Sequence, residues 1–474
     1  MPAPVATGLI GMWGSAPGDG VAVGQADAML HCGGSRVVTS GGETVSCATM
    51  TKKPSPSPSA PAVSRRRMLK AGLVAAGSTS MVAMAAHGAS KKVIRPLDVP
   101  PWTKSEGRNT GAAYGLPSRY EKHVGRMLTK NSPTKTASWS FTPIGDLHGM
   151  VTPNGLIFER HHAGIPDIDP AKHRLVVHGD VDQSLMFTMN DLKRFPAVSR
   201  FYFLECSGNT YMEWRQPTGG TVQWTHGLIS CCQWTGVPLA SILREAGMKP
   251  SARWLLAEGA DGAAMTRSIP VSKAMDDVLV VYAQNGEMLR PEHGYPLRLI
   301  VPGWEGNVNV KWLRRIKLAD KPFHTRQETS KYTDLQADGR ARQFSFLMEA
   351  KSVITTPSVG QRLDSRGFYE IRGLAWSGLG RIARVDVSLD GGRNWQPAQL
   401  DEPVLPKCLT VFRMPWRWNG DRTAIMSRAI DETGYVQPTR KQIVAARGNN
   451  FWNHYNGIQA WQVETDGTVT NVPA

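Results

Sequence analysis

Cysteine is scarce in this chain of 474 residues, and its six cysteines do not form the spacings that bind haem or zinc. No C-x-x-C-H motif is present, which excludes a covalent c-type haem on these residues. The lack of a C-x-x-C pair and of an H-E-x-x-H motif argues against a zinc site. No basic helix, zinc finger or other nucleic-acid motif stands out, so we expect no nucleic-acid partner.

Acidic residues are outnumbered by basic ones. The formal net charge is +16, and most of this excess lies after residue 86. A basic surface keeps a protein soluble, and it also attracts an anionic substrate or an acidic partner protein. The sequence leaves both interpretations open. Its length allows two or three domains, and a hydrophobic fraction of 41% is ordinary for a globular protein.

Long apolar runs are missing, and the first 90 residues instead have the pattern of an export signal. Residues 1–49 show little pattern. We interpret them either as an upstream extension that precedes the true start at Met50 or as a disordered leader. Residues 50–90 contain a Pro/Ser-rich spacer, Ser64-Arg65-Arg66-Arg67-Met68-Leu69-Lys70, a short apolar segment and Ala83-Met84-Ala85. This order is typical of a cleaved twin-arginine signal, which predicts export in the folded state to the periplasm.

Two alternatives to this export signal are open. The arginines could be a basic patch that precedes an alanine-rich helix by chance. Without cleavage the apolar segment could act as an anchor, although it is short for a membrane span. After cleavage we expect no stable span.

Strands and short helices alternate irregularly in the body of the chain, which predicts an α+β fold rather than a doubly wound sheet. Residues 91–137 are rich in Pro, Gly and charge, and we expect an extended arm that wraps the fold. Helices are expected within 187–195, 237–246 and 271–275. Strands are expected at 174–180, 254–257, 278–284 and 296–302, with turns at the end of 174–180 and at 258–262.

The character of the chain changes near residue 336, where short β-rich runs begin. Residues 382–389 alternate, Asp390-Gly391-Gly392 follow, and Trp395 opens a return strand, which predicts a β-hairpin. Repeated short strands with turn signals favour a β-sandwich. We therefore predict one domain at 138–330 and an Ig-like β-sandwich, used for packing or dimerisation, at 336–460.

The stretch Ser199–Trp214 is the centre of the functional hypothesis. Phe201-Tyr202-Phe203-Leu204 predicts a buried strand, and Ser207-Gly208-Asn209 predicts a tight turn directly after Cys206. The turn holds one thiol at the mouth of a strand, where a cofactor could reach it. We interpret Cys206 as a thiolate ligand to a metal; the alternative is a buried free cysteine.

Four stretches together resemble the sulfite oxidase family of molybdopterin enzymes, most closely its SoxC-type sulfane dehydrogenase subunits. They are Phe158-Glu-Arg-His-His162, Leu204-Glu-Cys-Ser-Gly-Asn209, His293-Gly-Tyr-Pro-Leu-Arg298, and Val301–Gly306 with Asn309-Val-Lys-Trp312. The resemblance covers about residues 140 to 455. It implies a molybdopterin-binding catalytic domain at 138–330 and an Ig-like dimerisation domain at 336–460. Molybdenum would be held by soft pterin sulfur and by the thiolate of Cys206.

The same resemblance implies which residues bind the cofactor and the substrate. Arg160 would hold the anionic oxygens of the substrate, and Tyr332 would be an active-site tyrosine. Some of the implied residues have ordinary alternative interpretations: His293 could be a core histidine, Arg298 and Lys311 could form surface ion pairs, and Tyr332 could be a loop tyrosine. The implied cofactor-binding residues are Phe158, Glu159, Arg160, His161, His162, Asp261, His293, Arg298, Asn309, Val310 and Lys311.

One position departs from the family pattern. Sulfite oxidases usually have an arginine after the Gly-Asn of the cysteine motif, and Thr210 and Tyr211 stand there in this chain. A cation is therefore missing where a small dianion would bind. We hypothesise a pocket that is less suited to free sulfite and more open to sulfur on a larger carrier.

Three further thiols, Cys231, Cys232 and Cys408, are odd in number. Either Cys231 or Cys232 could pair with Cys408 in an oxidising compartment, or all three could be buried free thiols.

The resemblance implies a subunit that oxidises sulfane sulfur on a carrier protein and passes electrons to a separate c-type cytochrome, since this chain carries no haem motif. A basic face could dock that cytochrome. The dimerisation domain implies a homodimer within a hetero-oligomer. The alternatives are a dehydrogenase of free sulfite and a non-catalytic binding or assembly subunit.

Overall fold

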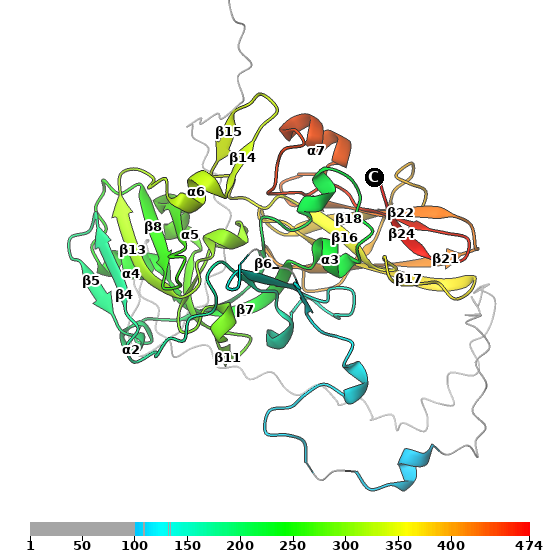
Figure 1. Ribbon diagram of the computed structural model, residues 1–474, viewed down its shortest axis with the longest axis horizontal. Coiled ribbons are helices and arrows are strands. Elements are labelled where there is room, and N and C mark those ends of the chain that lie inside the picture. Colours follow the sequence, from blue (N-terminus) through cyan, green and yellow to red (C-terminus); the bar gives the residue numbers. More distant parts are fainter. Residues whose placement is uncertain (1–99, 108–109, 131, 133) are drawn as a thin grey trace, which may run out of the picture. The chain divides into compact units, whose positions relative to one another are not determined.

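A computed structural model describes residues 100–107, 110–130, 132 and 134–474, all within the compact unit Met84–Ala474. The predicted leader and export signal, residues 1–49 and 50–90, lie outside the described residues. Among the described residues, no helix combines the length and the apolar character that a bilayer crossing requires. The structure is rich in strands and poor in helices, as the predicted α+β class requires (Figure 1).

The first half of the described chain contains two five-stranded sheets. The mixed sheet has the order β5-β4-β13-β8-β9, in which only β13 and β4 are parallel. Its strands are β4 (Leu175–Gly179), β5 (Leu185–Phe187), β8 (Trp254–Gly259), β9 (Thr266–Pro270) and β13 (Leu313–Ala319).

The other sheet is antiparallel and carries the cysteine turn. Its order is β11-β10-β7-β6, and β12 pairs with β10. Its strands are β6 (Val198–Glu205), β7 (Ile229–Pro238), β10 (Leu279–Gln284), β11 (Glu287–Met288) and β12 (Arg298–Ile300). A smaller sheet lies before them in sequence, formed by β1 (Met127–Leu128), β2 (Ser138–Phe141) and β3 (Arg160–His161).

The helices of this half are short. Helix α4 (Leu239–Glu245) buries Leu239, Ile242 and Leu243 in one core cluster, and Gly247 adopts the left-handed conformation just after it, at φ 66°. Residues 237 and 238 belong to β7, so the helix begins later than predicted. The other helices are α2 (Met189–Leu192), α3 (Val222–His226), α5 (Val271–Asp276) and α6 (Arg326–Ser330).

Two predicted elements have different bounds in the structure. Strand β8 runs to Gly259, so the first two residues of the predicted 258–262 turn pair with β13 and β9. The predicted strand 296–302 forms only over β12, because Pro296 and Pro302 at its ends have no N–H to donate to the sheet. The helices predicted within 187–195 and at 271–275 are present as α2 and α5.

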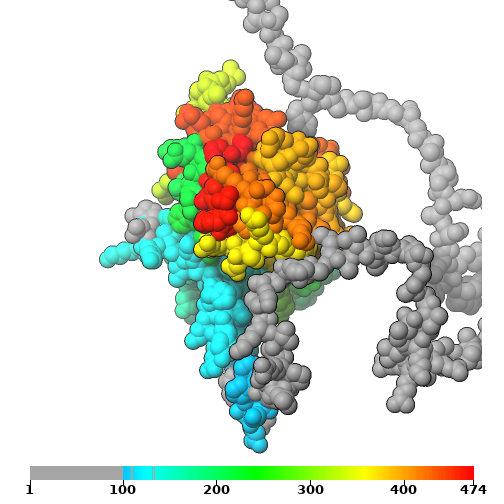
Figure 2. All heavy atoms as spheres, turned by 90° about the vertical axis from the view of Figure 1, so that its right-hand side faces the viewer, coloured from blue at the N-terminus to red at the C-terminus, as the bar shows by residue number. Residues whose placement is uncertain are grey.

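The second half of the described chain is a β-sandwich of two antiparallel sheets, which gather in Figure 2 as the yellow to red region. One sheet has the order β16-β17-β21-β20 and the other β19-β18-β22-β23-β24. The strands are β16 (Lys351–Thr356), β17 (Gly367–Trp376), β18 (Ile382–Ser388), β19 (Gln396–Pro397), β20 (Gln399–Leu400), β21 (Thr410–Trp418), β22 (Thr423–Asp431), β23 (Ala460–Val463) and β24 (Val469–Val472).

The predicted hairpin of the sandwich is present, with β18 paired to β19. Gly391 and Gly392 take positive φ in its turn, and the Asp390 carboxylate accepts bonds from the backbone N–H groups of Arg393 and Asn394. Strands β23 and β24 extend the sheet beyond residue 460. The hairpin of β14 (Thr333–Leu335) and β15 (Ala341–Gln343) and helix α7 (Arg440–Arg447) were not predicted.

The sandwich packs directly on the sheet that carries the cysteine turn. Alternate side chains of β6 and β7 point to opposite faces of that sheet. Phe203 and Cys231 join the core of the sandwich, whereas Leu204 and Cys232 join the cluster on the other face. Cys408 is in the sandwich core beside Cys231, and its thiol donates to the carbonyl of Phe201 at 2.9 Å. Cys231, Cys232 and Cys408 are all buried free thiols.

Candidate active site

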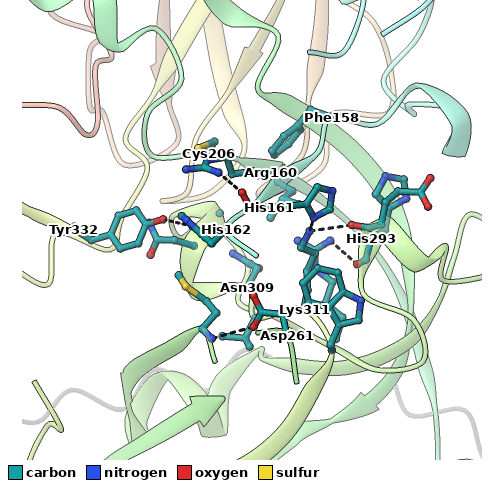
Figure 3. Close-up of a pocket in the computed structure, with 18 residues that line it drawn as sticks. Phe158, Arg160, His161, His162, Cys206, Asp261, His293, Asn309, Lys311 and Tyr332 are labelled. Atoms are coloured by element: carbon teal, nitrogen blue, oxygen red, sulfur yellow. Dashed lines mark hydrogen bonds between the residues drawn. The ribbon is translucent and has the colours of Figure 1, made fainter. Parts of the chain in front are cut away.

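Segments that are far apart in the sequence meet around one narrow cavity of about 80 Å³. Arg160 and His161 come from β3, Cys206 follows β6, and Tyr332 follows α6. Figure 3 shows Tyr332 and His162 on one side of this cavity and His293 on the other. All the residues that the resemblance implied, except Glu159, line the cavity: Phe158, Arg160, His161, His162, Cys206, Asp261, His293, Arg298, Asn309, Val310, Lys311 and Tyr332.

Glu159 lies outside the cavity and supports a residue that lines it. Its carboxylate accepts a bond from His161 Nε2 at 2.9 Å and pairs with Arg126. The other ring nitrogen of His161, Nδ1, then accepts from Lys311 Nζ at 2.8 Å. Burial, together with Lys311 and Arg160, lowers the pKa of His161 to about 3, so this imidazole is neutral at pH 7.

Cys206 is the first residue after β6, in a turn closed by short backbone bonds. Its N–H donates to Leu228 O at 3.0 Å, and its carbonyl accepts from the N–H of Asn209 at 2.9 Å. A distant segment of the chain, at Gly306, packs against this turn. A Cβ on Gly306 would stand 3.1 Å from Cys206 Cα. Burial raises the pKa of the Cys206 thiol, and the Arg160 guanidinium opposes this shift.

Three basic side chains, Arg160, Arg298 and Lys311, line the narrow cavity without a matching number of acids. Arg298 Nη1 donates to His293 O at 2.9 Å, and Lys311 Nζ also donates to Glu292 O at 2.9 Å. Among the described residues, no carboxylate forms an ion pair with Arg160, Arg298 or Lys311. Burial lowers the pKa of Arg298 to about 10, and burial together with Arg298 lowers the pKa of Lys311 well below its usual value, so a bound anion would favour the charged form of the lysine. A buried cation without a partner is unfavourable, so this cluster suits an anionic group.

Polar atoms without partners point to the same kind of ligand. Both ring nitrogens of His293, which is 1% exposed, lack a hydrogen-bond partner among the described residues, and so does Arg298 Nε. Native proteins rarely leave such buried groups unsatisfied. Burial, aided by Arg298 and Lys311, lowers the pKa of His293 well below its usual value, so its ring is neutral and offers one donor and one acceptor. The residues present therefore fit a phosphate attached to a polar ring.

A second and wider cavity of about 540 Å³ opens on the other side of Cys206. It shares Arg160, His162, Cys206 and Tyr332 with the narrow cavity. The Tyr332 hydroxyl is bonded to His162 Nε2 at 3.3 Å, and the Arg267 guanidinium lies 5.0 Å from the centre of the Tyr332 ring. Burial raises the pKa of Tyr332, so the hydroxyl keeps its proton at neutral pH. The aromatic walls are Trp139, Phe141, Tyr211, Trp224 and Trp452.

Several buried residues around this site were not foreseen. Glu205 and Glu305 are buried carboxylates next to the cysteine turn, and Lys351 and His454 pair with them from the sandwich. Glu205 is part of the Leu204–Asn209 motif, so its position could have been noticed. Lys351 and His454 have no local signal, since their partners lie 146 and 149 residues away.

Clusters of metal ligands of the usual kind are not part of this site. No group of three or more His, Cys, Asp or Glu side chains that could hold a metal occurs among the described residues. The one thiol between the two cavities matches a metal whose remaining ligands come from a cofactor.

Two protein-family models match the chain. Residues 162–327 match "Oxidoreductase molybdopterin binding domain", and residues 342–460 match "Mo-co oxidoreductase dimerisation domain". These are the two domain types that the sequence predicts, in the predicted order.

Curated relatives and a solved structure agree with these matches. Mitochondrial sulfite oxidase of Mus musculus is 34% identical over 64% of this chain and 61% of its own length. Sulfite oxidase of Gallus gallus is 32% identical over 61% of this chain and 68% of its own length. The chain thus spans about three fifths of the length of the first of these relatives.

A crystal structure of the sulfane dehydrogenase SoxCD from Paracoccus pantotrophus is similar to this chain. It is 48% identical to this chain with a TM-score of 0.78, and the match covers 80% of this chain and 98% of that chain. The family implies molybdopterin with molybdenum as cofactor, which agrees with the cations and the thiol around the narrow cavity. The chain belongs to the sulfite oxidase family of molybdopterin oxidoreductases.

Proposed function

We propose that this chain is the molybdenum subunit of an enzyme that oxidises sulfane sulfur bound to a carrier protein. The observation that carries the proposal is the junction of the two cavities. The narrow cationic cavity and the wide aromatic cavity meet at Cys206, beside Arg160, His162 and Tyr332. One cavity suits a cofactor and the other a substrate, and the only thiol on both linings lies between them.

The cofactor side follows from the unpaired polar groups. When bound, Mo-molybdopterin supplies two-electron redox chemistry. The Cys206 thiolate would be its protein ligand, and the cations Arg298 and Lys311 would bind the phosphate. His293 would bond the pterin ring with the two nitrogens that have no protein partner. The remaining contacts would come from Phe158, Arg160, His161, His162, Asp261, Asn309 and Val310, with Glu159 orienting His161.

The substrate side depends on Arg160 and Tyr332. The guanidinium of Arg160 would hold anionic oxygens of the oxidised sulfur, because it is the one cation that lines both cavities. Tyr332 keeps its proton, so its hydroxyl would donate a hydrogen bond to an oxygen beside Cys206. His162, whose pKa burial and Arg160 lower to about 4, would stay neutral and orient that hydroxyl.

The size and chemistry of the wide cavity favour a carrier-bound substrate over free sulfite. A cavity of about 540 Å³ lies within the size range that accepts organic ligands. Thr210 and Tyr211 add no cation to it. The 48% identical neighbour is named a sulfane dehydrogenase, which supports the same substrate class for this chain.

Partners and location are part of the proposal. Electrons would leave to a separate c-type cytochrome, and the basic charge of the chain would help to dock it. Residues 336–460 would form the dimer of this chain within a hetero-oligomer, after the catalytic domain at 138–330 and the arm at 91–137. Export to the periplasm would follow from the twin-arginine signal.

A sulfite dehydrogenase that acts on free sulfite is the second candidate. It is favoured by the names of two curated relatives, the sulfite oxidases of Mus musculus and Gallus gallus, which are 34% and 32% identical to this chain. A non-catalytic binding subunit is less well supported, because Arg160, Cys206 and Tyr332 are all present and all lie at the junction of the two cavities.

Molybdenum per polypeptide, measured by elemental analysis, is the first test. About one molybdenum per chain is expected after expression in a host that makes the pterin and exports folded proteins. No molybdenum would favour the binding subunit. Steady-state turnover of a persulfidated carrier protein is then compared with turnover of sulfite, and preference for sulfite would favour the second candidate.

A further inference from the structure

Residues of the β-sandwich hold the cysteine turn from behind. Glu205 is fully buried directly before Cys206, and its carboxylate is bonded by two side chains of the sandwich. Lys351 Nζ, at the start of β16, donates to Glu205 Oε1 at 2.9 Å. Trp376 Nε1, at the end of β17, donates to Glu205 Oε2 at 2.7 Å.

The Lys351 ammonium connects both ends of the turn. Besides Glu205, it donates to Thr210 Oγ1 at 3.0 Å. Thr210 has left-handed backbone geometry at φ 67°, which is unfavourable for a β-branched residue. Asn209 adds a bond from Nδ2 to Glu205 Oε1 at 2.9 Å. The turn is therefore fixed before and after Cys206 by one buried cation that belongs to the other domain.

The sandwich also holds the middle of the turn, through His454, and Asn307 of the first domain adds a second contact. The N–H of His454 donates to Ser207 O at 2.9 Å, and His454 Nε2 donates to Glu305 Oε1 at 2.5 Å. Asn307 Nδ2 donates to Glu305 Oε2 at 2.7 Å and to Ser207 Oγ at 3.1 Å. Ser207 is thus bonded at its carbonyl and at its hydroxyl.

Stability alone does not explain this arrangement. A buried ion pair contributes little net stability compared with apolar residues of the same volume, because both charges lose their hydration. Groups that hold a metal ligand in place from outside matter for the geometry and reactivity of the ligand. The hydrogen bonds of the Glu205 carboxylate fix the six-residue turn 205–210, which contains the proposed metal ligand Cys206.

We propose that the β-sandwich, beyond any part in dimerisation, positions the Cys206 thiol: Lys351 and Trp376 act through Glu205, and His454 acts through Ser207. The role of Cys206 as a ligand rests on the proposed function, whereas the clamping of the turn does not. Lys351, Trp376 and His454 are positioning residues, since none of them lines the narrow cavity.

Hydrogen exchange of the cofactor-free full-length chain tests the clamp directly. Trp376→Phe removes the indole N–H and leaves a smaller aromatic ring in the core, so it should fold even if Lys351→Met does not. Exchange of amides in the 205–210 turn should rise at least about tenfold in Trp376→Phe, while β16 and β21 stay protected, because a hydrogen bond to a charged group is lost. The matched control is Trp461→Phe, which removes a buried indole bond to Ile354 O at 2.8 Å.

Two results would overturn the clamp. Turn exchange in Trp376→Phe could stay at the wild-type level, or Trp461→Phe could raise it equally. Either result gives Glu205 no role in fixing the turn, whatever the molybdenum content of the wild type. Absence of molybdenum from the wild type would instead contradict the proposed function. The hydrogen-exchange result on the turn would still be valid.

The loaded protein tests the consequence for the ligand. The thiolate-to-metal charge-transfer absorption should shift in Trp376→Phe and not in Trp461→Phe. The kcat should fall about tenfold or more, within the range typical for such supporting residues, with KM little changed. A faster-exchanging turn with unchanged absorption and kcat would show that the clamp does not position the thiol.

Discussion

The rings of Tyr211 and Trp452 stack with their centroids 4.8 Å apart and their planes at 20°. Tyr211 follows the cysteine turn, and Trp452 lies far along the chain, between α7 and β23. Both line the wide cavity, and they are 38% and 56% exposed. The stacked pair therefore forms part of the cavity wall that meets solvent, and it offers apolar surface where a free dianion would need a cation.

Tyr211→Arg should make the enzyme better at free sulfite. A new guanidinium at a half-exposed position should lower KM for sulfite by up to about fivefold, since exposed ion pairs contribute up to roughly 1 kcal/mol. Turnover of a persulfidated carrier should fall, because the stack is lost. Steady-state kinetics with both substrates measure this.

Tyr211→Phe is the control for this substitution, since it keeps a ring for stacking and adds no charge. Its KM for sulfite should match that of the wild type. An unchanged KM for sulfite in Tyr211→Arg would mean that this wall of the cavity does not select the substrate.

Cys206→Ser should abolish turnover while leaving molybdenum in the protein. The pterin and the phosphate contacts would still hold the group, but the thiolate ligand would be missing. The loss should exceed the roughly 100-fold that removal of a supporting group causes. Elemental analysis and turnover on the same sample measure both quantities. Cys408→Ser is the matched control, because a serine hydroxyl can still donate to Phe201 O.

The cations of the narrow cavity should bind inorganic phosphate in the cofactor-free chain. Phosphate at ten times its Kd would stabilise the fold by about 1.4 kcal/mol and raise Tm by a few degrees. Lys311→Met should remove most of that rise, and Lys172→Met, at an exposed lysine, should not. Thermal scans against phosphate concentration give the answer. Equal rises in both variants would place the phosphate elsewhere.

The sequence predicted the elements whose signals are local. The apolar run before Cys206 predicted a buried strand, and Ser207-Gly208-Asn209 predicted its turn. Gly247 predicted the end of α4, and Asp390-Gly391 predicted the hairpin of the sandwich. Each signal lies within a few residues of the structure that it forms, so periodicity and turn chemistry were sufficient.

Contacts between distant residues could not be predicted in this way. The bond between Glu205 and Lys351 joins positions 146 apart, and neither residue has a spacing that names the other. The β14–β15 hairpin was missed because its strands have three residues each and no apolar alternation. The residues around the cavity were named from the family resemblance, and their meeting in space depends on the packing of whole sheets.

The protonated form of His454 should make the stability of the cofactor-free chain depend on pH. Burial alone would lower its pKa, but the carboxylates of Glu305 and Glu349 raise it to about 9. The unfolded chain has a histidine pKa near 6.5, so the folded state binds the extra proton between these values. Stability from this group is therefore complete below about pH 6.5 and is lost as pH rises towards 9.

His454→Gln should remove that dependence. Urea unfolding at several pH values should show the wild type losing about 3 kcal/mol more than the variant between pH 6 and pH 9, the difference set by the two pKa values. His123→Gln, in the exposed arm, should follow the wild type. Parallel curves for wild type and His454→Gln would mean that His454 is neutral in the fold. The bond would then join a neutral imidazole to the Glu305 carboxylate, and Arg267, 3.8 Å from that carboxylate, would remain as its cationic partner.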